Sequence, residues 1–424
     1  MDRRSNASGC TPRAAIHLPR SYLPPATRRN APGRSLPVAC VPRRPTRRSG
    51  LPADFPRIRI LEKSARVSEG LLFVTPRRFL AIVDNNGVPR FHRRGNATLW
   101  NFRPHVTGPL IDGRRVRYSV SRQDGVELLD RQLAAIRTVN VVGDLNRADP
   151  HDFLITREGN FLFVAYQPAT RDPCAAPQSC RDEYLDSVIQ EVTPSGDEVF
   201  RWNSWDHFER SDCELSKDYA HLNSMQISAD DIIASFWTCS QVLRIDRSGS
   251  TGAVEWQLGG TEPSRPAGTE YLELVGDDGA DNEFCGQHQA TLTGGGRLVL
   301  FDNGIGCSGP RKNRARFTRV AEYDVSSGTQ ASYVREFRLP ASQGAADHWG
   351  GVTVLSNGHW LVTWGARRGL RAADPSATIA VSEYDPATDT ALFHMHMSRN
   401  GTDIATYRVY REPEAAVSIP LNLP

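Results

Sequence analysis

The sequence predicts an all-β fold, and in particular a six-bladed β-propeller, from three observations. The 424 residues include 34 glycines and 28 prolines but only four methionines, a composition that suits short strands and turns. Apolar segments of strand length alternate with turn residues from Pro56 onward. A pair of hairpins also recurs along the chain, and four-stranded units at a long period are typical of propellers.

Seven strands are expected before the clearest repeats begin, enough for two blades. They are 71–76, 79–84, 88–92, 100–106, 115–121, 125–130 and 133–139, with Asn-Asn-Gly at 85–87 as a hairpin turn. A last strand, 406–411, is expected to pair with the first blade. That pairing would close the ring and remove an open sheet edge.

Four hairpins that each begin with a histidine supply the other four blades. They start at His151, His221, His288 and His348, at spacings of 70, 67 and 60 residues. A second hairpin follows each of them, at 187–202, 241–258, 319–337 and 378–397. The uneven spacing is attributed to insertions at 167–186, 203–218 and 261–286.

Residues 1–55 are predicted to form a disordered basic tail ahead of a propeller domain at 56–424. Residues 1–50 hold eleven arginines, eight prolines and one acid, so their charge is about +10 and the remainder carries about −7. The acidic body argues against nucleic-acid binding. The tail resembles an organelle-targeting segment, although its prolines oppose an amphipathic helix, and a mispredicted start codon is the favoured explanation. No apolar run is long enough to span a bilayer.

The cysteines of the body favour an oxidising compartment. There are six, and Cys174 and Cys180 bracket a short loop suited to a disulfide. Pairings of 213 with 239 and of 285 with 307 are suggested by neighbourhood alone. Six free thiols in a cytosolic protein remain the alternative.

The repeat register places the four histidines at one mouth of a central channel, since the first strand of each blade lines that channel. Clustered imidazoles can bind a metal, transfer protons or act as nucleophiles. Each histidine could instead satisfy a loop carbonyl, and His151 is the one most readily assigned to structure. The strands of the other three lack nearby carboxylates, apart from Asp347, so no metal site is expected.

Arginines follow the third histidine-led hairpin. Arg311, Arg314, Arg316 and Arg319 come after Asn303, and guanidinium groups match tetrahedral oxyanions such as sulfate or phosphate. A solvated loop face is the alternative, and it is favoured for Arg314 and Arg316.

Several segments together resemble the arylsulfotransferase (aryl-sulfate sulfotransferase) family over residues 70–397. They are Ala220-His-Leu-Asn-Ser, Trp256-Gln-Leu-Gly-Gly, Gln287-His-Gln-Ala, Phe301-Asp-Asn-Gly, Thr318-Arg-Val-Ala-Glu-Tyr-Asp and Asn357-Gly-His-Trp-Leu-Val-Thr-Trp-Gly. The resemblance implies a six-bladed propeller that moves a sulfuryl group from an aryl sulfate to a phenol. It implies a ping-pong route through a sulfohistidine and no cofactor, without 3′-phosphoadenylyl sulfate. The lack of a glycine-rich phosphate loop after a strand agrees with that.

The resemblance also implies roles for single residues. His348 would be the nucleophile, while His221 and His288 would bind sulfuryl oxygens and shuttle the phenol proton. Arg311 would stabilise the developing charge, with Arg319 in reserve because the segment between Asp-Asn-Gly and Arg311 is longer than in the family. Further substrate contacts would come from Asn223, Gln287, Asn303, Arg319 and His151.

Two other functions remain open from the sequence. One is a catalytically silent propeller that binds a partner or glycan at its channel mouth, and the other is a metal-dependent lyase or hydrolase. Cysteine usage and the family resemblance favour a periplasmic or secreted location, although no signal peptide is visible at the N-terminus.

Overall fold

In the computed structural model the chain divides into two units, residues 1–48 and 49–424. The structure describes residues 50–106, 108–171, 182–207, 213, 218, 220–249, 251–260, 268–276, 283–305, 317–340, 344, 346–366 and 379–417, all in the second unit. Most of the tail predicted at 1–55 lies outside them. Phe55, at its end, is buried, and its ring lies 5.1 Å from that of Phe79.

The first two sheets have four strands each, in the orders β29-β2-β3-β4 and β10-β9-β8-β5. Their strands are β2 (Leu71–Val74), β3 (Phe79–Val83), β4 (Pro89–Arg94), β5 (Phe102–Pro104), β8 (Tyr118–Arg122), β9 (Gly125–Leu129), β10 (Ala135–Val139) and β29 (Val409–Glu412). The seven strands predicted ahead of His151 are therefore present. A small hairpin of β6 (Leu110–Ile111) and β7 (Arg114–Arg115) was not predicted.

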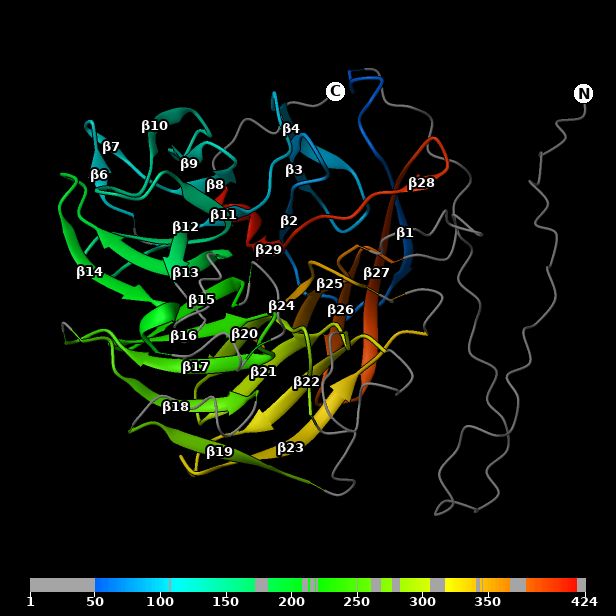
Figure 1. Cartoon of the computed structure of the whole chain (residues 1–424). Helices are drawn as coiled ribbons and strands as arrows, with labels where there is room; N and C mark the ends of the chain where they lie inside the picture. Colours follow the sequence, from blue (N-terminus) through cyan, green and yellow to red (C-terminus); the bar gives the residue numbers. More distant parts are fainter. Residues whose placement is uncertain are drawn as a thin grey trace, which may run out of the picture. The chain divides into compact units, whose positions relative to one another are not determined.

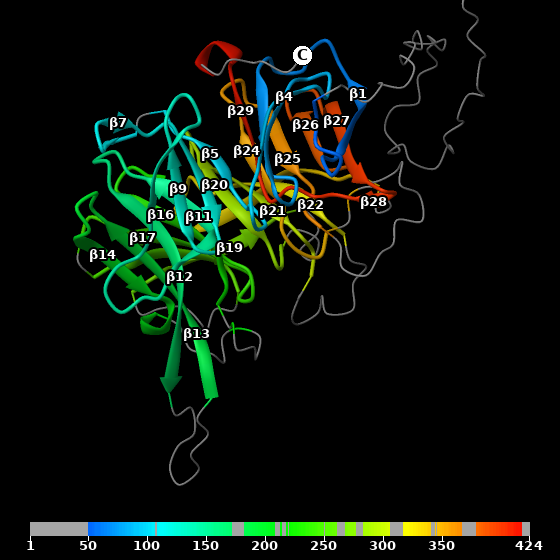
Figure 2. The same cartoon turned by 90° about the horizontal axis from the view of Figure 1, so that it is seen from above.

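The third sheet follows the order β11-β12-β13-β14. Its strands are β11 (Ala148–Ile155), β12 (Phe161–Arg171), β13 (Asp182–Val192) and β14 (Glu198–Asn203), and the 3₁₀ helix η1 (Ser204–Asp206) follows. β12 and β13 stay paired from Phe161↔Val192 to Arg171↔Asp182, which takes the hairpin into the segment assigned to an insertion. Figure 2 shows the ends of these two strands projecting beyond their neighbours.

A nine-stranded sheet combines two of the expected units. It contains β15 (Leu222–Ser228), β16 (Asp231–Phe236), β17 (Gln241–Asp246), β18 (Val254–Gly259), β19 (Glu270–Val275), β23 (Gln330–Phe337), β22 (Arg319–Asp324), β21 (Arg297–Asp302) and β20 (His288–Thr293), in that order. β19 was unexpected, because it lies within the insertion assigned to 261–286. It pairs in parallel with both β18 and β23 and so joins two four-stranded groups.

The last sheet has six strands: β1 (Arg57–Lys63), β24 (Gly351–Val354), β25 (Trp360–Thr363), β26 (Val381–Asp385), β27 (Thr390–Arg399) and β28 (Thr402–Asp403). β1 was not predicted, and it pairs with β27. The short 3₁₀ helix η5 (Glu414–Ala416) follows β29. Within the described residues, no helix is long and apolar enough to cross a membrane.

The two ends of the unit are exchanged between the first and last sheets (Figure 1). β29 pairs antiparallel with β2, from Leu71↔Glu412 to Val74↔Val409, which confirms the predicted pairing of the C-terminal strand with the first hairpins. β1 meanwhile completes the edge of the last sheet on β27. Backbone hydrogen bonds therefore tie both ends into the body.

Strands of neighbouring sheets, most of them edge strands, contact one another in a closed series. β29 contacts β5, β8 and β9 contact β11, and β11 contacts β15; the series continues through β20 and β24 back to β29. Apolar side chains fill the space between neighbouring sheets, as where Val164 and Ile189 pack with Leu222 and Ile232. The starts of these edge strands are therefore brought to one region.

Candidate active site

The four predicted histidines lie in, or just ahead of, four edge strands that belong to three sheets. His151 is in β11, His221 directly precedes β15, His288 begins β20, and His348 forms an isolated bridge with Ala366 ahead of β24. The rings of His151 and His221 are 4.9 Å apart. His288 lies close enough to both for their charges to affect its pKa.

Aromatic rings missed by the sequence analysis connect these histidines. Trp100 lies 5.1 Å from His151 and 5.3 Å from Trp349, between ring centroids. Trp349 in turn lies 5.4 Å from His348, and Tyr407 lies 5.7 Å from His151. The fourth histidine thus belongs to the same cluster, and the rings provide faces on which an aromatic ligand can stack.

The hydrogen bonds of Asn303 define the state of His288. The Asn303 Nδ2 donates to the carbonyl oxygens of Trp349 (3.0 Å) and Ala346 (3.3 Å), so its Oδ1 is the acceptor that faces His288. The His288 Nδ1 lies 2.8 Å from that oxygen and donates to it. Burial lowers the pKa of His288 well below its ordinary value, so the ring is neutral and its Nε2 carries a lone pair.

Two histidines of the cluster have carboxylate partners. The His151 Nδ1 contacts the Asp149 carboxylate, and the His221 Nδ1 contacts that of Asp218. The expectation that the His221 strand lacks a nearby carboxylate was therefore wrong, because Asp218 lies three residues earlier in the chain. A carboxylate on Nδ1 fixes the ring orientation and leaves Nε2 to face a ligand.

Three residues of the cluster have strained backbones. His221, Gln289 and Trp349 have φ angles of +54°, +43° and +64°. These lie in the left-handed region, which residues other than glycine adopt at a cost of about 1 kcal/mol or more. Such strain persists where packing over-determines the conformation, and it is concentrated here at the starts of three successive edge strands.

A buried ion cluster lies behind the histidines. The Asp152 carboxylate is fully buried and accepts from Arg103 Nη2 (2.7 Å), Arg408 Nη1 (2.9 Å) and the Met225 backbone N–H (2.9 Å). Burial alone would raise the pKa of Asp152, but the charges of Arg103 and Arg408 outweigh it and hold that pKa below its ordinary value. The carboxylate is therefore ionised.

Arg408 brings positive charge to the site and was missed by the sequence analysis. Its Nη2 donates to the Asn223 carbonyl at 2.8 Å, and its charge contributes to the lowered pKa of His288. Its Nε–H has no hydrogen-bond partner among the described residues. One N–H of this buried guanidinium is therefore unbonded within the described structure.

The model of the arylsulfotransferase (ASST) family matches residues 59–408, most of the chain. The chain belongs to the arylsulfotransferase family. Membership supports a sulfotransferase activity on small molecules, and it bears out the resemblance stated from the motifs. A comparison with curated protein sequences finds no match.

Solved structures similar to this arylsulfotransferase family member include a protein of unknown function from Bacteroides caccae, at 11% identity and a TM-score of 0.48, covering 80% of this chain and 100% of that one. The β-propeller domain of Cps50 (Swd1) from Myceliophteria thermophila is 11% identical, with a TM-score of 0.39 and coverage of 82% and 91%. BamB from Moraxella catarrhalis is 13% identical, with a TM-score of 0.31 and coverage of 73% and 96%.

Two predicted substrate contacts of the arylsulfotransferase are fully buried and bonded to the backbone. The Asn223 Nδ2 donates to the Gln287 carbonyl at 2.8 Å and ties β15 to the start of β20. The Gln287 Nε2 donates to the carbonyls of Phe236 (3.1 Å) and Gln241 (2.8 Å) and to Ser235 Oγ (3.1 Å). In this structure both side chains position the histidine strands.

Of the predicted arginines, Arg319 lies within the described part of the chain, and its guanidinium bonds to groups other than the histidines. Arg319 is buried, where its Nε donates to Asp302 (2.9 Å) and its Nη1 to Glu336 (2.7 Å). Its Nη2 donates to the Glu283 carbonyl at 2.6 Å, in the segment that precedes β20, so all three guanidinium nitrogens are bonded. Arg311 lies outside the described residues.

One predicted cysteine pair lies entirely within the described residues, and it is bonded as predicted. Cys213 and Cys239 form a disulfide, as suggested from neighbourhood. Cys285 is also disulfide-bonded, and its predicted partner Cys307 lies outside the described residues, as do Cys174 and Cys180. The disulfide Cys213–Cys239 is consistent with an extracytoplasmic location for this family member.

Proposed function

We propose that this arylsulfotransferase family member is a six-bladed propeller that moves a sulfuryl group from an aryl sulfate to a phenol through a sulfohistidine, independently of 3′-phosphoadenylyl sulfate. The gathering of His151, His221, His288 and His348 around aromatic rings carries the proposal. A cavity of about 320 Å³ supports the propeller, because its lining includes residues of β11, β15, β20, β24 and β29. Such a cavity suits a central channel.

The first half-reaction begins at His348. A neutral imidazole attacks the sulfur of the aryl sulfate, the S–N bond forms and the bond to the phenolic oxygen breaks. The departing phenolate takes a proton from His221, whose Nδ1 contacts the Asp218 carboxylate. In the second half-reaction an acceptor phenol returns its proton to His221 and its oxygen attacks sulfur, which releases His348.

His288 and Arg408 are assigned to the sulfuryl oxygens. The free His288 is neutral, but an anionic ester beside it favours protonation of its Nε2, which would then donate to an oxygen. The Nε–H of Arg408 is a second donor, and fixed donors of this kind stabilise charge that develops on the ester. The predicted Arg311 remains a further candidate, and His151 would orient the donor ring.

Mass spectrometry after single-turnover incubation with 4-nitrophenyl sulfate tests the mechanism. A sulfated histidine should appear on the peptide that contains His348 and be absent in His348→Ala. His92→Gln, on β4, is a matched histidine control that should keep the modification. No adduct in the wild type, or nitrophenol release that is equal with and without an acceptor phenol, would contradict a ping-pong transferase.

The competing functions give different outcomes in the same experiments. A silent binding propeller predicts that His221→Ala and His348→Ala change no activity. A metal-dependent lyase or hydrolase predicts a stoichiometric divalent ion in the purified protein and loss of turnover with a chelator. Among the described residues, no group of three or more His, Cys, Asp or Glu side chains is placed to hold a metal ion.

A further inference from the structure

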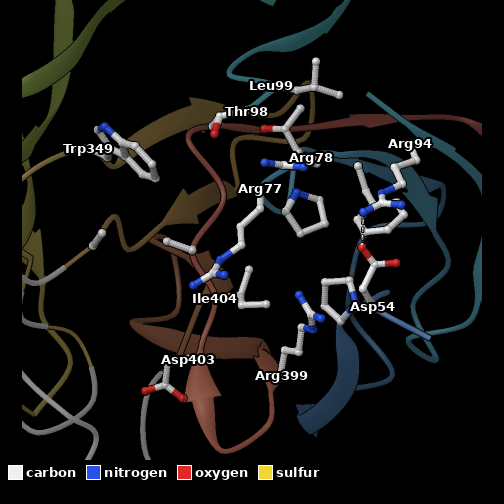
Figure 3. A pocket seen from close by; sticks show the side chains of 16 residues that line it. Asp54, Arg77, Arg78, Arg94, Thr98, Leu99, Trp349, Arg399, Asp403 and Ile404 are labelled. Carbon is white, nitrogen blue, oxygen red and sulfur yellow. Dashed lines mark ion pairs between the residues drawn. The ribbon is translucent and has the colours of Figure 1, made fainter. Parts of the chain in front are cut away.

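A cationic pocket of about 640 Å³ adjoins the histidine cluster (Figure 3). Its lining includes Trp349, whose ring is 5.4 Å from His348, and Ala366, the bridge partner of His348. Trp349 is therefore shared by the pocket and the histidine cluster. None of the predicted site residues lines it.

Arginines dominate the charge of this pocket. Four line it, together with two acids. Arg94 is neutralised by an ion pair with Asp54 at 2.9 Å. The other three, Arg77, Arg78 and Arg399, form no ion pair among the described residues, and Figure 3 shows Arg77 and Arg399 extending into the hollow.

The remaining acid of the lining does not cancel that charge. The Asp403 Oδ1 lies 2.9 Å from His396 Nε2, so this oxygen faces a partner outside the lining. Apart from the Arg94–Asp54 pair, the lining therefore holds three guanidinium groups and one carboxylate. The imbalance favours an anionic ligand over a neutral or cationic one.

The backbone holds two of these arginines in fixed positions. They form the turn between β2 and β3, and Arg77 has a φ of +59°, where glycine or asparagine would be less strained. The Arg77 carbonyl accepts from the Leu99 N–H (2.8 Å), and the Arg78 carbonyl accepts from the Gly95 N–H (2.7 Å). These two bonds hold the backbone of the strained turn against the segment that leads to β5, so the positions from which the two exposed side chains extend are fixed.

We propose that this pocket binds a second anionic group of the aromatic substrate, a carboxylate or sulfonate, while the reacting oxygen lies at the histidines. This inference rests on the proposed transferase function and names its substrate class: aryl sulfates and phenols with an acidic side arm. Guanidinium groups pair with such oxyanions through charge-assisted hydrogen bonds. Trp349, shared by the pocket and the cluster, would contact the ring between the two anionic groups.

The test compares matched acceptors with 4-nitrophenyl sulfate as the constant donor. A series of 4-hydroxyphenyl carboxylic acids with one, two or three methylenes is set against the corresponding neutral amides, which keep the phenol unchanged. For at least one length, kcat/KM for the acid should exceed that for the amide by roughly tenfold. In the double variant Arg77→Gln/Arg399→Gln, the ratio of kcat/KM for the acid to that for the amide should fall to about one. Arg157→Gln, in an exposed turn outside the pocket, should keep the wild-type ratio.

Calorimetric titration with the same acids and amides separates this inference from the transferase proposal. If the protein turns over no aryl sulfate but binds an acid in preference to its amide, and the double variant loses that preference, the pocket stands and the transferase proposal falls. Binding should also weaken with added salt. Equal affinity for acids and amides in the wild type, or an undiminished preference in the double variant, would overturn the pocket assignment.

Discussion

The Asp152 carboxylate and the Arg408 guanidinium meet at 2.9 Å although 256 residues separate them in the chain, and both side chains are buried. This pair joins β11 to the segment that leads into β29. The same ion pair also positions Arg408, the cationic donor proposed for the sulfuryl group. This one contact therefore serves both the stability of the unit and the proposed reaction.

Asp152→Asn should strongly destabilise the unit. The change leaves the buried Arg408 and the partly buried Arg103 without their counter-charge, and breaking a buried pair costs about 3–5 kcal/mol. Urea unfolding measures the loss in the free energy of unfolding. Arg66→Gln is the control, because Arg66 pairs with Asp385 but its side chain is 51% exposed, and it should cost less than about 1 kcal/mol. Equal losses in the two variants would contradict the central role of Asp152.

Gly70→Ala should weaken the pairing of β2 with β29. Gly70 has a φ of +121°, and a Cβ at this position would meet the backbone oxygen of Glu412. Gly196→Ala is a matched control, since its φ is +100° and a Cβ there would meet nothing within 4 Å. We expect both variants to be destabilised by the positive φ angle. Gly70→Ala should lose about 1–2 kcal/mol more of the free energy of unfolding, measured by thermal or urea unfolding. A difference near zero would show that the pairing adjusts freely.

Asn303→Ala should impair the proposed reaction through His288. It removes the acceptor of the His288 Nδ1–H and the donors to the Trp349 and Ala346 carbonyls. We expect kcat to fall by about 10- to 100-fold with a smaller change in KM, and nitrogen NMR to lose the signature of an Nδ1-protonated neutral ring. Asn357→Ala, whose Nδ2 donates to Ser68 Oγ near the surface, should change neither. An unaltered tautomer in Asn303→Ala would refute the positioning role.

Acidification should destabilise the protein through its buried neutral histidines. Burial, helped by Arg103 and Arg117, lowers the pKa of His105 to about 3. The folded state therefore binds a proton at His105 less readily than the unfolded chain does, so stability is fully present above the unfolded pKa of about 6.5 and is lost as the pH falls below it. His105 accounts for about 2 kcal/mol of loss between about pH 7.5 and about pH 5.

His105→Gln should reduce this pH dependence by that amount. Glutamine can retain a bond to Ser119 Oγ, which lies 2.8 Å from the His105 Nε2, but it does not titrate. Urea unfolding at the two pH values measures the difference between variant and wild type. Part of the pH dependence of the free energy of unfolding should remain in this variant because of His288 and His394. Burial also lowers their pKa values, that of His394 to about 4.

The histidine repeat could be recognised in the sequence because local pattern determines where edge strands begin. The tail-to-head pairing of β29 with β2 followed from the need to cover a sheet edge. β1 was missed because its place depends on β27, more than 300 residues later. β19 lies in a segment with the alternating pattern Glu-Tyr-Leu-Glu-Leu-Val, but its parallel pairing with two strands could not be derived from hairpin rules.

Site residues outside the repeats were less predictable. Edge strands from different sheets converge and bring together Trp100, Trp349 and Tyr407. The local spacing of residues in the sequence cannot predict this contact. Asp218 was within reach of sequence analysis, three residues before His221. Arg319 matched a family motif, but its burial beside Asp302 depends on pairing between β21 and β22.

The exchange of β1 and β29 between the first and last sheets has a consequence for synthesis on the ribosome. β2 leaves the ribosome more than 300 residues before β29, the strand that covers its edge. Until β29 follows, that edge can pair with another nascent chain. β2 spans only Leu71–Val74. So short an edge offers few backbone hydrogen-bonding groups to another chain before β29 is available.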